Sequence, residues 1–260
     1  MQVLAAAVAP DPDWRLAAVL AVLVVTATVA SYVGQLGVGH DHVTAAGRAV
    51  VQLTVVSLAI AATLSSVWWS LAFVLLMYVV ATVTSGRRVD VPARQLPWVG
   101  LAVAAGAAPV IGLTLASGVI PVNGAGIVPM AGILIGGAMT VATLAGRRAS
   151  AELRGRRGEY EAGLAIGLPR VDAAMLVIQP SARDALAPGL DQTRTVGLVT
   201  LPGAFVGVLL GGGTPVQAGA AQILVLVGLM AVQAITAAVL LRVMAQGRVV
   251  CADLHGVYPR

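Results

Sequence analysis

Few side chains in this sequence are suited to chemistry, and those that could bind a metal ion lie in two places. His40, Asp41 and His42 are consecutive, and imidazole and carboxylate groups are common metal ligands. Two histidines this close seldom complete a site alone, so the stretch is either a solvated loop or part of a site completed from elsewhere. Met130 and Met139 carry thioethers, which are soft metal ligands but also frequent packing groups in apolar helices.

The sequence lacks the motifs of common hydrolytic enzymes. It contains no lysine, so it has no phosphate-binding loop of the Gly-x-x-x-x-Gly-Lys-Ser/Thr type. Neither a His-Glu-x-x-His helix nor a Gly-x-Ser-x-Gly elbow occurs. Nearly all carboxylates lie outside the apolar segments, which leaves no obvious carrier for a proton relay. We therefore predict a chain that is not an enzyme by itself and has no cofactor of its own.

Two other features interrupt the apolar segments. Gln52 lies one helical turn after Arg48 on the same face, so its amide must find a partner on another helix or along a substrate path. Pro202 and Gly203 lie together within an apolar run, where proline removes a backbone hydrogen bond and must kink or break a helix. Such a break is typical of transport pathways, and helix packing alone also explains it.

The longest charged segment, residues 147–191, contains a regular spacing. A Glu-Ala-Gly triplet at 161–163 is followed by three residues and Gly167, and then by nine residues, Val177, one residue and Gln179-Pro180. This spacing resembles a degenerate EAA loop of ABC importer permeases, a cytoplasmic helix pair that docks into a separate ATPase. Gly163 and Gln179 depart from that pattern.

The residues of this segment predict a stiff corner. An arginine-rich helix over 149–166 would end at Gly167, which can adopt the left-handed conformation, and Pro169 could begin the next helix. We assign coupling to an ATPase to the corner and to two acidic residues before it: Glu159, Glu161, Gly167, Leu168 and Pro169. The alternative is an ordinary helical hairpin between two membrane spans.

The composition is that of an integral membrane protein. Hydrophobic residues make up 58% of the 260-residue chain and charged residues only 10%, against about 25% in soluble domains. A helix needs about 20 apolar residues to cross the hydrocarbon layer. We predict an all-α, polytopic fold that forms a single permease domain over residues 1–260, with about seven spans near 16–33, 49–65, 68–85, 97–118, 124–146, 192–212 and 217–242.

The arginines predict the orientation. They cluster in alternate loops, whereas Arg15 falls on the opposite side of the predicted spans. By the positive-inside rule the N-terminus lies outside and the C-terminus and the 147–191 loop lie inside. The same rule accounts for the net charge of +5 without a nucleic-acid partner.

The order of several segments resembles one family, the iron-export ABC permeases of the FetB type and their plant relatives, the aluminium-sensitivity membrane proteins. The likeness covers about residues 45 to 245. Its segments are Arg48 to Leu53, Ile120-Pro121, Ile127 to Thr140, Ala151 to Arg154, Arg157 to Glu159, Ala165 to Pro169, Thr195 to Gly203 and Thr214 to Ala218.

This resemblance implies the permease subunit of an ATP-driven exporter in the cell membrane, paired with itself and with two copies of a cytoplasmic ATPase that binds ATP and Mg. It also implies iron or another metal ion as cargo, and plant relatives are linked to sugar nucleotides as well. One departure is Gly137, where the family is expected to carry an asparagine. We place Gln52, Met130, Met139, Pro202 and Gly203 along the pathway.

Two other classes stay open from the sequence. One is an ion-coupled carrier that needs no ATPase, and the other is a membrane scaffold that recruits a soluble partner without transporting anything. ATP dependence separates the first class from an ABC exporter. Flux of any kind separates both transporters from the scaffold.

Overall fold

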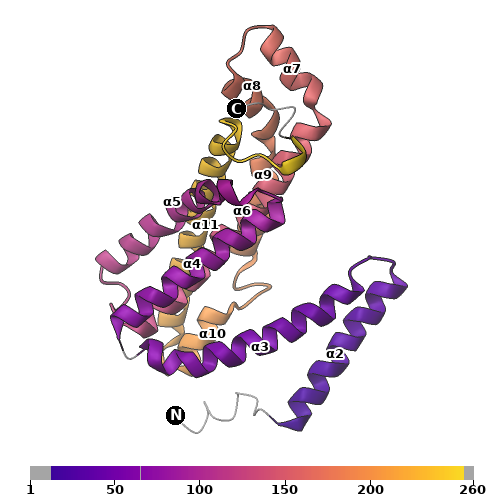
Figure 1. Ribbon diagram of the computed structural model, residues 1–260. Helices are drawn as coiled ribbons and strands as arrows, with labels where there is room; N and C mark the ends of the chain where they lie inside the picture. The colour runs from indigo at the N-terminus through magenta and orange to yellow at the C-terminus, as the bar shows by residue number, and fades with distance from the viewer. Residues whose placement is uncertain (1–12, 65, 255–260) are drawn as a thin grey trace.

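The computed structural model describes residues 13–64 and 66–254, without the side chains of 58–64. Every regular element in these residues is a helix (Figure 1). The longer helices are α2 (Trp14–Val33), α3 (Gly39–Leu64), α4 (Val67–Val89), α5 (Leu96–Ala116), α6 (Gly124–Gly155) and α11 (Pro215–Ala245). The shorter ones are η1 (Ala93–Gln95), α7 (Arg157–Ala165), α8 (Arg170–Ile178), α9 (Pro180–Thr195), α10 (Gly203–Leu210) and η2 (Ala252–Leu254).

Helix α6 is the centre of the bundle, and it packs against α4, α5 and α11. Its buried residues recur every three or four positions and so share one face, and most of them are small: Ala131, Leu134, Ala138, Val141 and Ala145, each at most 1% exposed. Small side chains let neighbouring backbones approach closely, which is the main source of helix association in apolar surroundings. By contrast α2 packs chiefly against α3, and the two form a hairpin beside the bundle (Figure 1).

Five helical segments are long and apolar enough to cross a membrane, which confirms the all-α, polytopic fold. They are Trp14–Val33, Val67–Val89, Ala93–Ala116, Gly124–Gly155 and Pro215–Ala245. They coincide with five of the seven predicted spans. The predicted span at 49–65 falls on α3, but its end lies outside the described residues.

The predicted span at 192–212 is not one continuous helix. Helix α9 continues to Thr195, residues 196–202 are not helical, and α10 contains only eight residues. The predicted break at Pro202-Gly203 is confirmed, because Pro202 is the N-cap of α10. Apolar length alone predicts a span here, but it does not register the left-handed Gly197 or the proline that interrupts it.

Helix α6 contains Pro129 yet runs without interruption from Gly124 to Gly155. Asn123 caps the helix through a hydrogen bond from the Gly126 N–H to its Oδ1 at 2.9 Å. Proline costs one backbone hydrogen bond. Ile127 and Met130, buried on either side of Pro129, hold the turn in place.

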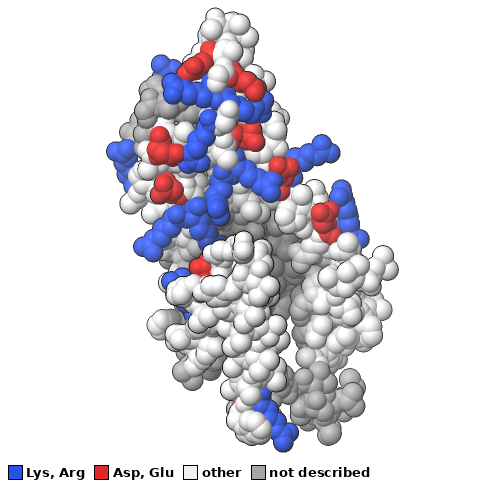
Figure 2. Space-filling model, turned by 90° about the vertical axis from the view of Figure 1, so that its right-hand side faces the viewer, with Lys and Arg blue, Asp and Glu red and all other residues white. Residues whose placement is uncertain are grey.

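Charged residues gather at one end of the molecule. The 32 residues of α6 span about 48 Å, more than the about 30 Å of a hydrocarbon layer. Its last turns therefore extend beyond the apolar bundle and carry α7, α8 and α9 (Figure 1). Figure 2 shows arginines and acidic residues over this upper part, whereas most of the lower part of that face is uncoloured.

Candidate coupling corner and transmembrane groove

The corner predicted at Gly167 is present, but the single helix predicted over 149–166 is wrong, because the chain breaks at Arg156 between the end of α6 and the start of α7. Gly167 has a φ of +89°, in the left-handed region. Its N–H donates to the Leu164 carbonyl at 3.0 Å, and the Leu168 N–H donates to the Gly163 carbonyl at 3.0 Å. This pair of bonds is a Schellman motif, which satisfies the last carbonyls of α7. Pro169 then caps the start of α8, as predicted.

Close packing of α7 on α8 makes the corner narrow. Gly163 is buried, and a Cβ added there would lie 3.2 Å from the Cβ of Ala173 and 3.5 Å from Leu168 Cδ1. The departure from alanine at Gly163 in the EAA-like pattern therefore has a structural reason. A methyl group would press on the facing helix, whereas glycine allows the two helices to touch.

The two acidic residues assigned to coupling form ion pairs on the exposed side of α7. Arg156 pairs with Glu159, with its Nε 2.7 Å from Oε1, and the guanidinium lowers the pKa of that carboxyl. Arg157 Nε lies 2.7 Å from Glu161 Oε1. Exposed ion pairs contribute little to stability because water and salt screen them, so these carboxylates are available to a partner at small energetic cost.

The corner is joined to the membrane bundle by direct contacts. Helices α8 and α9 pack against α6 and α11. Arg148 on α6 forms a salt bridge with Asp184 on α9 at 2.6 Å. Arg156 Nη1 donates to the Val177 carbonyl at 3.4 Å, which links the start of α7 to the end of α8. Force on the corner would therefore reach α6 and α11 through packed helices.

One exposed apolar residue at the corner was missed from the sequence. Ile166 is 80% exposed and directly precedes Gly167. An exposed isoleucine beside a left-handed glycine is well suited to contact a partner surface. Its place directly before the glycine of the Ala-Ile-Gly triplet is visible in the sequence, but charge and spacing do not distinguish an exposed isoleucine from a core residue.

A groove of about 580 Å³ lies between α3, α4 and α6. Two of the predicted pathway residues, Gln52 and Met139, line it. Gly132 and Gly136 form part of its wall and leave space where larger side chains would fill it. Met77 of α4 also lines the groove, although the sequence offered no motif to single it out. One amide and two thioethers thus face an otherwise apolar groove.

The other predicted pathway residues lie elsewhere. Met130 is buried in the core of the bundle, and its Cε would be 3.9 Å from a Cβ added at Gly228 on α11. Pro202 and Gly203 begin α10, which packs against α11. The structure therefore brings together Gln52 and Met139 but not Met130, Pro202 and Gly203.

The glutamines of α11 make helix contacts. Gln222 is buried, and its Oε1 accepts a hydrogen bond at 3.3 Å from the Phe205 N–H, in the first turn of α10. Gln233 lies against α9, since a Cβ added at Gly189 would be 2.0 Å from its Oε1. Gln222 thus links α11 to α10, and Gln233 links α11 to α9.

The histidine pair lies at the α2–α3 hairpin. His42 Nε2 is 2.7 Å from Ser31 Oγ, so it joins the two helices, while His40 is exposed. In the part of the chain that the structure describes, His, Cys, Asp and Glu nowhere gather in groups of three or more suited to hold a metal ion. The stretch from His40 to His42 forms the first turn of α3 and not a loop.

The C-terminal segment is tied to α6 by an ion pair with a testable pH dependence. Arg154 Nη2 lies 2.9 Å from Asp253 Oδ1, and the guanidinium lowers the pKa of Asp253. A carboxyl with a lowered folded-state pKa stabilises the protein above its unfolded pKa, and this contribution is lost as the pH falls through the folded value.

We expect Asp253→Asn to lower the melting temperature slightly at pH 7, because an exposed pair contributes about 0.2–1 kcal/mol. The difference from the wild type should shrink as the pH falls below about 4, where the wild-type carboxyl also becomes neutral. Thermal unfolding of the purified protein in detergent at several pH values measures this. A difference that widens with acidity would contradict the assignment.

A bundle of apolar helices of membrane-crossing length, joined to one charged helical extension, defines a multi-pass helical membrane protein. The profile of the uncharacterised protein family UPF0014 matches residues 14–248, and the chain belongs to this family. This confirms the family resemblance found in the sequence. No solved structure matches the chain at a significant level.

Three relatives illustrate the family. The UPF0014 membrane protein STAR2 of Oryza sativa subsp. japonica is 33% identical over 80% of this chain and 74% of its own length. The protein ALUMINUM SENSITIVE 3 of Arabidopsis thaliana is 31% identical over 83% of this chain and 81% of its own length. The probable iron export permease protein FetB of Escherichia coli K12 is 27% identical over 78% of this chain and 79% of its own length.

Proposed function

We propose that this chain is the membrane-spanning permease subunit of an ATP-driven ABC exporter, with iron or another metal ion as its cargo. A separate cytoplasmic ATPase, which binds ATP and Mg, docks on the 147–191 extension. The chain itself supplies the pathway and no catalytic residue. This places it in the cell membrane, with its N-terminus outside and its C-terminus and coupling corner inside.

The observation that carries the proposal is the corner at Gly167. It is rigid because of its Schellman motif, it lies at the arginine-rich end, and packed helices connect it to α6. A docking element must combine these properties, since a flexible loop cannot transmit force. The relation to the FetB protein, named a probable iron export permease, supports the cargo class.

The groove between α3, α4 and α6 is the proposed pathway. It offers the amide of Gln52 and the thioethers of Met77 and Met139 to a cargo. Thioethers are soft ligands and favour transition metals over Mg or Ca. Because α6 both lines the groove and carries the corner, movement of the docked ATPase would shift one groove wall against α3 and α4.

The proposed assembly is a homodimer. Two ATPases close on each other when they bind ATP, and each needs its own docking corner. A chain with one corner provides only one of the two docking sites. A second copy therefore completes the transporter.

Co-purification from the native membrane tests the proposal. The tagged chain should elute with an ATPase that carries a phosphate-binding loop, at about one ATPase per tagged chain. Reproducible purification of a stable chain without any ATPase would argue against it. Iron flux without ATP would then favour an ion-coupled carrier, and absence of all flux would favour a scaffold.

Gln52→Leu is expected to reduce ATP-dependent cargo flux about tenfold while leaving the ATPase bound, because one lost polar contact in an apolar groove is equivalent to about 1–2 kcal/mol. The matched control is Thr54→Val, since Thr54 bonds to its own helix at Val50 and does not line the groove. Flux into inside-out vesicles measures both. If the two variants transport cargo at the same rate, Gln52 does not contact the cargo on its pathway.

A further inference from the structure

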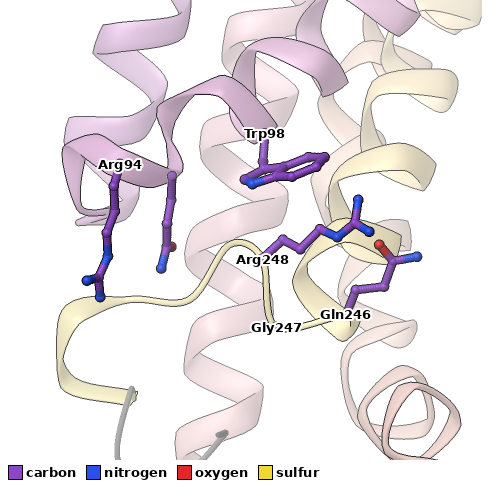
Figure 3. Close-up of a pocket in the computed structure, with 6 residues that line it drawn as sticks. Arg94, Trp98, Gln246, Gly247 and Arg248 are labelled. Carbon is purple, nitrogen blue, oxygen red and sulfur yellow. The ribbon is translucent and has the colours of Figure 1, made fainter. Parts of the chain in front are cut away.

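A second cavity, of about 360 Å³, lies at the arginine-rich end of α5 and α11. It is lined by Arg94, Gln95, Trp98, Gln246, Gly247 and Arg248. Figure 3 shows Trp98, on the first turn of α5, over Arg248 in the turn that carries Gln246 and Gly247, while Arg94, on the turn before α5, points toward the segment that follows Arg248. The proposed transport function uses none of these residues.

The turn that forms one wall is held in place. The Gly247 N–H donates to the Met244 carbonyl at 2.8 Å and the Arg248 N–H to the Val243 carbonyl at 3.1 Å, which is again a Schellman motif. The following segment is fixed to the end of η1, directly before α5, because the Val250 N–H donates to Oε1 of the buried Gln95 at 2.9 Å. The wall is therefore a built part of the fold.

The same segment is fixed to α4. The Cys251 thiol is buried and donates to the Val89 carbonyl at 2.8 Å. Burial raises the pKa of this thiol, which keeps it protonated and able to donate. The Ala252 N–H adds a bond to the Asp90 carbonyl at 3.3 Å. The cavity thus has a wall that is fixed to α4 as well as to η1.

Two arginines line this cavity, and neither is paired with a carboxylate of the described residues. The Arg248 Cζ lies 4.3 Å from the centroid of the Trp98 ring, so a cation–π contact holds its side chain. In the described part of the chain, no acidic group forms a salt bridge with Arg94 or Arg248. By contrast Arg148, Arg154, Arg156, Arg157 and Arg194 all pair with acidic residues.

We propose that this cavity binds a phosphate group, either that of an anionic lipid headgroup or that of a soluble phosphate. Arginine suits phosphate oxygens because its donors form a planar fork, and the Gln246 amide can donate a further hydrogen bond. Basic pockets between membrane helices are suited to lipid headgroups.

The surroundings of the cavity also suit a lipid. Trp98 lies near the start of the candidate span Ala93–Ala116, where an amphipathic ring suits the membrane interface. Leu101, three residues further into the span, is 47% exposed on the same helix face and can contact an acyl chain. A phosphate bound here would bridge α5 to the 246–248 turn and stabilise the end of the chain.

The test is native mass spectrometry of the full-length protein in detergent, titrated with phosphatidylglycerol, phosphatidylcholine or inorganic phosphate. One phosphatidylglycerol should bind saturably. The Arg94→Gln/Arg248→Gln double variant should bind it about 30-fold more weakly, since each arginine near an anionic headgroup contributes about a fivefold factor. Trp98→Leu should give a smaller loss, because it removes only the cation–π contact.

The control is Arg87→Gln/Arg88→Gln, which removes two exposed arginines at the end of α4 that do not line the cavity. Displacement of the lipid by inorganic phosphate would identify a soluble phosphate as the ligand, whereas binding of phosphatidylglycerol alone would identify a lipid. Equal lipid affinity in the pocket variant and the control variant, with both folded by their melting temperatures, would overturn the proposal.

Discussion

Gly167→Val is expected to reduce the ATPase recovered with the tagged chain by about tenfold, because a left-handed conformation costs an ordinary residue about 1–2 kcal/mol and more when it is β-branched. Gly167 has a φ of +89°, and a side chain there would meet no neighbouring atom within 4 Å. The effect would therefore come from the backbone of the corner and not from a clash. Quantitative mass spectrometry of the eluted complex measures the recovered ATPase.

Gly118→Val is the matched control for this substitution. Gly118 also has a left-handed φ, of +71°, with no neighbouring atom within 4 Å, and it follows α5 at the opposite end of the bundle. It should carry the same strain but leave the ATPase bound. Equal loss of ATPase in both variants would mean that general destabilisation, and not the corner, controls docking.

Gly136→Leu is expected to separate stability from transport. Gly136 lines the groove on α6, and an added Cβ would meet nothing within 4 Å. Glycine in a helix interior costs about 0.5–1 kcal/mol relative to good helix formers, so the variant should melt at the same or a higher temperature. The leucine side chain would fill the groove, and we expect cargo flux to fall about tenfold or more because the pathway is narrowed.

Gly219→Leu controls for this change. Gly219 lies on α11 with nothing within 4 Å of an added Cβ, and it does not line the groove. Flux through this variant should match the wild type. If Gly136→Leu transports as well as Gly219→Leu, the cargo does not pass between α3, α4 and α6.

The corner was predictable because its residues have restricted backbone choices. Gly167 and Pro169, two residues apart after an arginine-rich helical pattern, leave few alternatives to a helix end followed by a helix start. Apolar length was equally informative for the spans at 16–33, 68–85 and 217–242, which coincide with α2, α4 and α11. These features depend on local chemistry, which a sequence displays directly.

The remaining features depend on tertiary contacts. Met130 and Met139 are nine residues apart on one helix, yet the structure buries the first against α11 and places the second in the groove. No property of the methionines distinguishes them, because the difference is set by which neighbour each helix face meets. The cavity lined by Arg94 and Arg248 was not predictable for the same reason. The two residues are far apart in the chain, and only the fixed C-terminal segment brings them to one cavity.

The interruption at 196–202 shows a different limit. Hydropathy reports apolar character and not backbone conformation, so the mostly apolar residues 196–202 satisfy the span prediction although all seven positions are non-helical. The proline and glycine residues marked the end of the interruption at 202–203. Its beginning is set by the end of α9, which is held by contacts to α6 and α11 that lie outside any local window.

The most direct test of the central claim is metal flux in vesicles that contain the purified chain with or without the ATPase that co-purifies with it. An ATP-driven permease should transport ferrous ion only when the ATPase and hydrolysable ATP are both present, and should transport none with a non-hydrolysable analogue. Flux of equal rate through the chain alone, without ATP, would contradict an ATP-driven permease and identify an ion-coupled carrier.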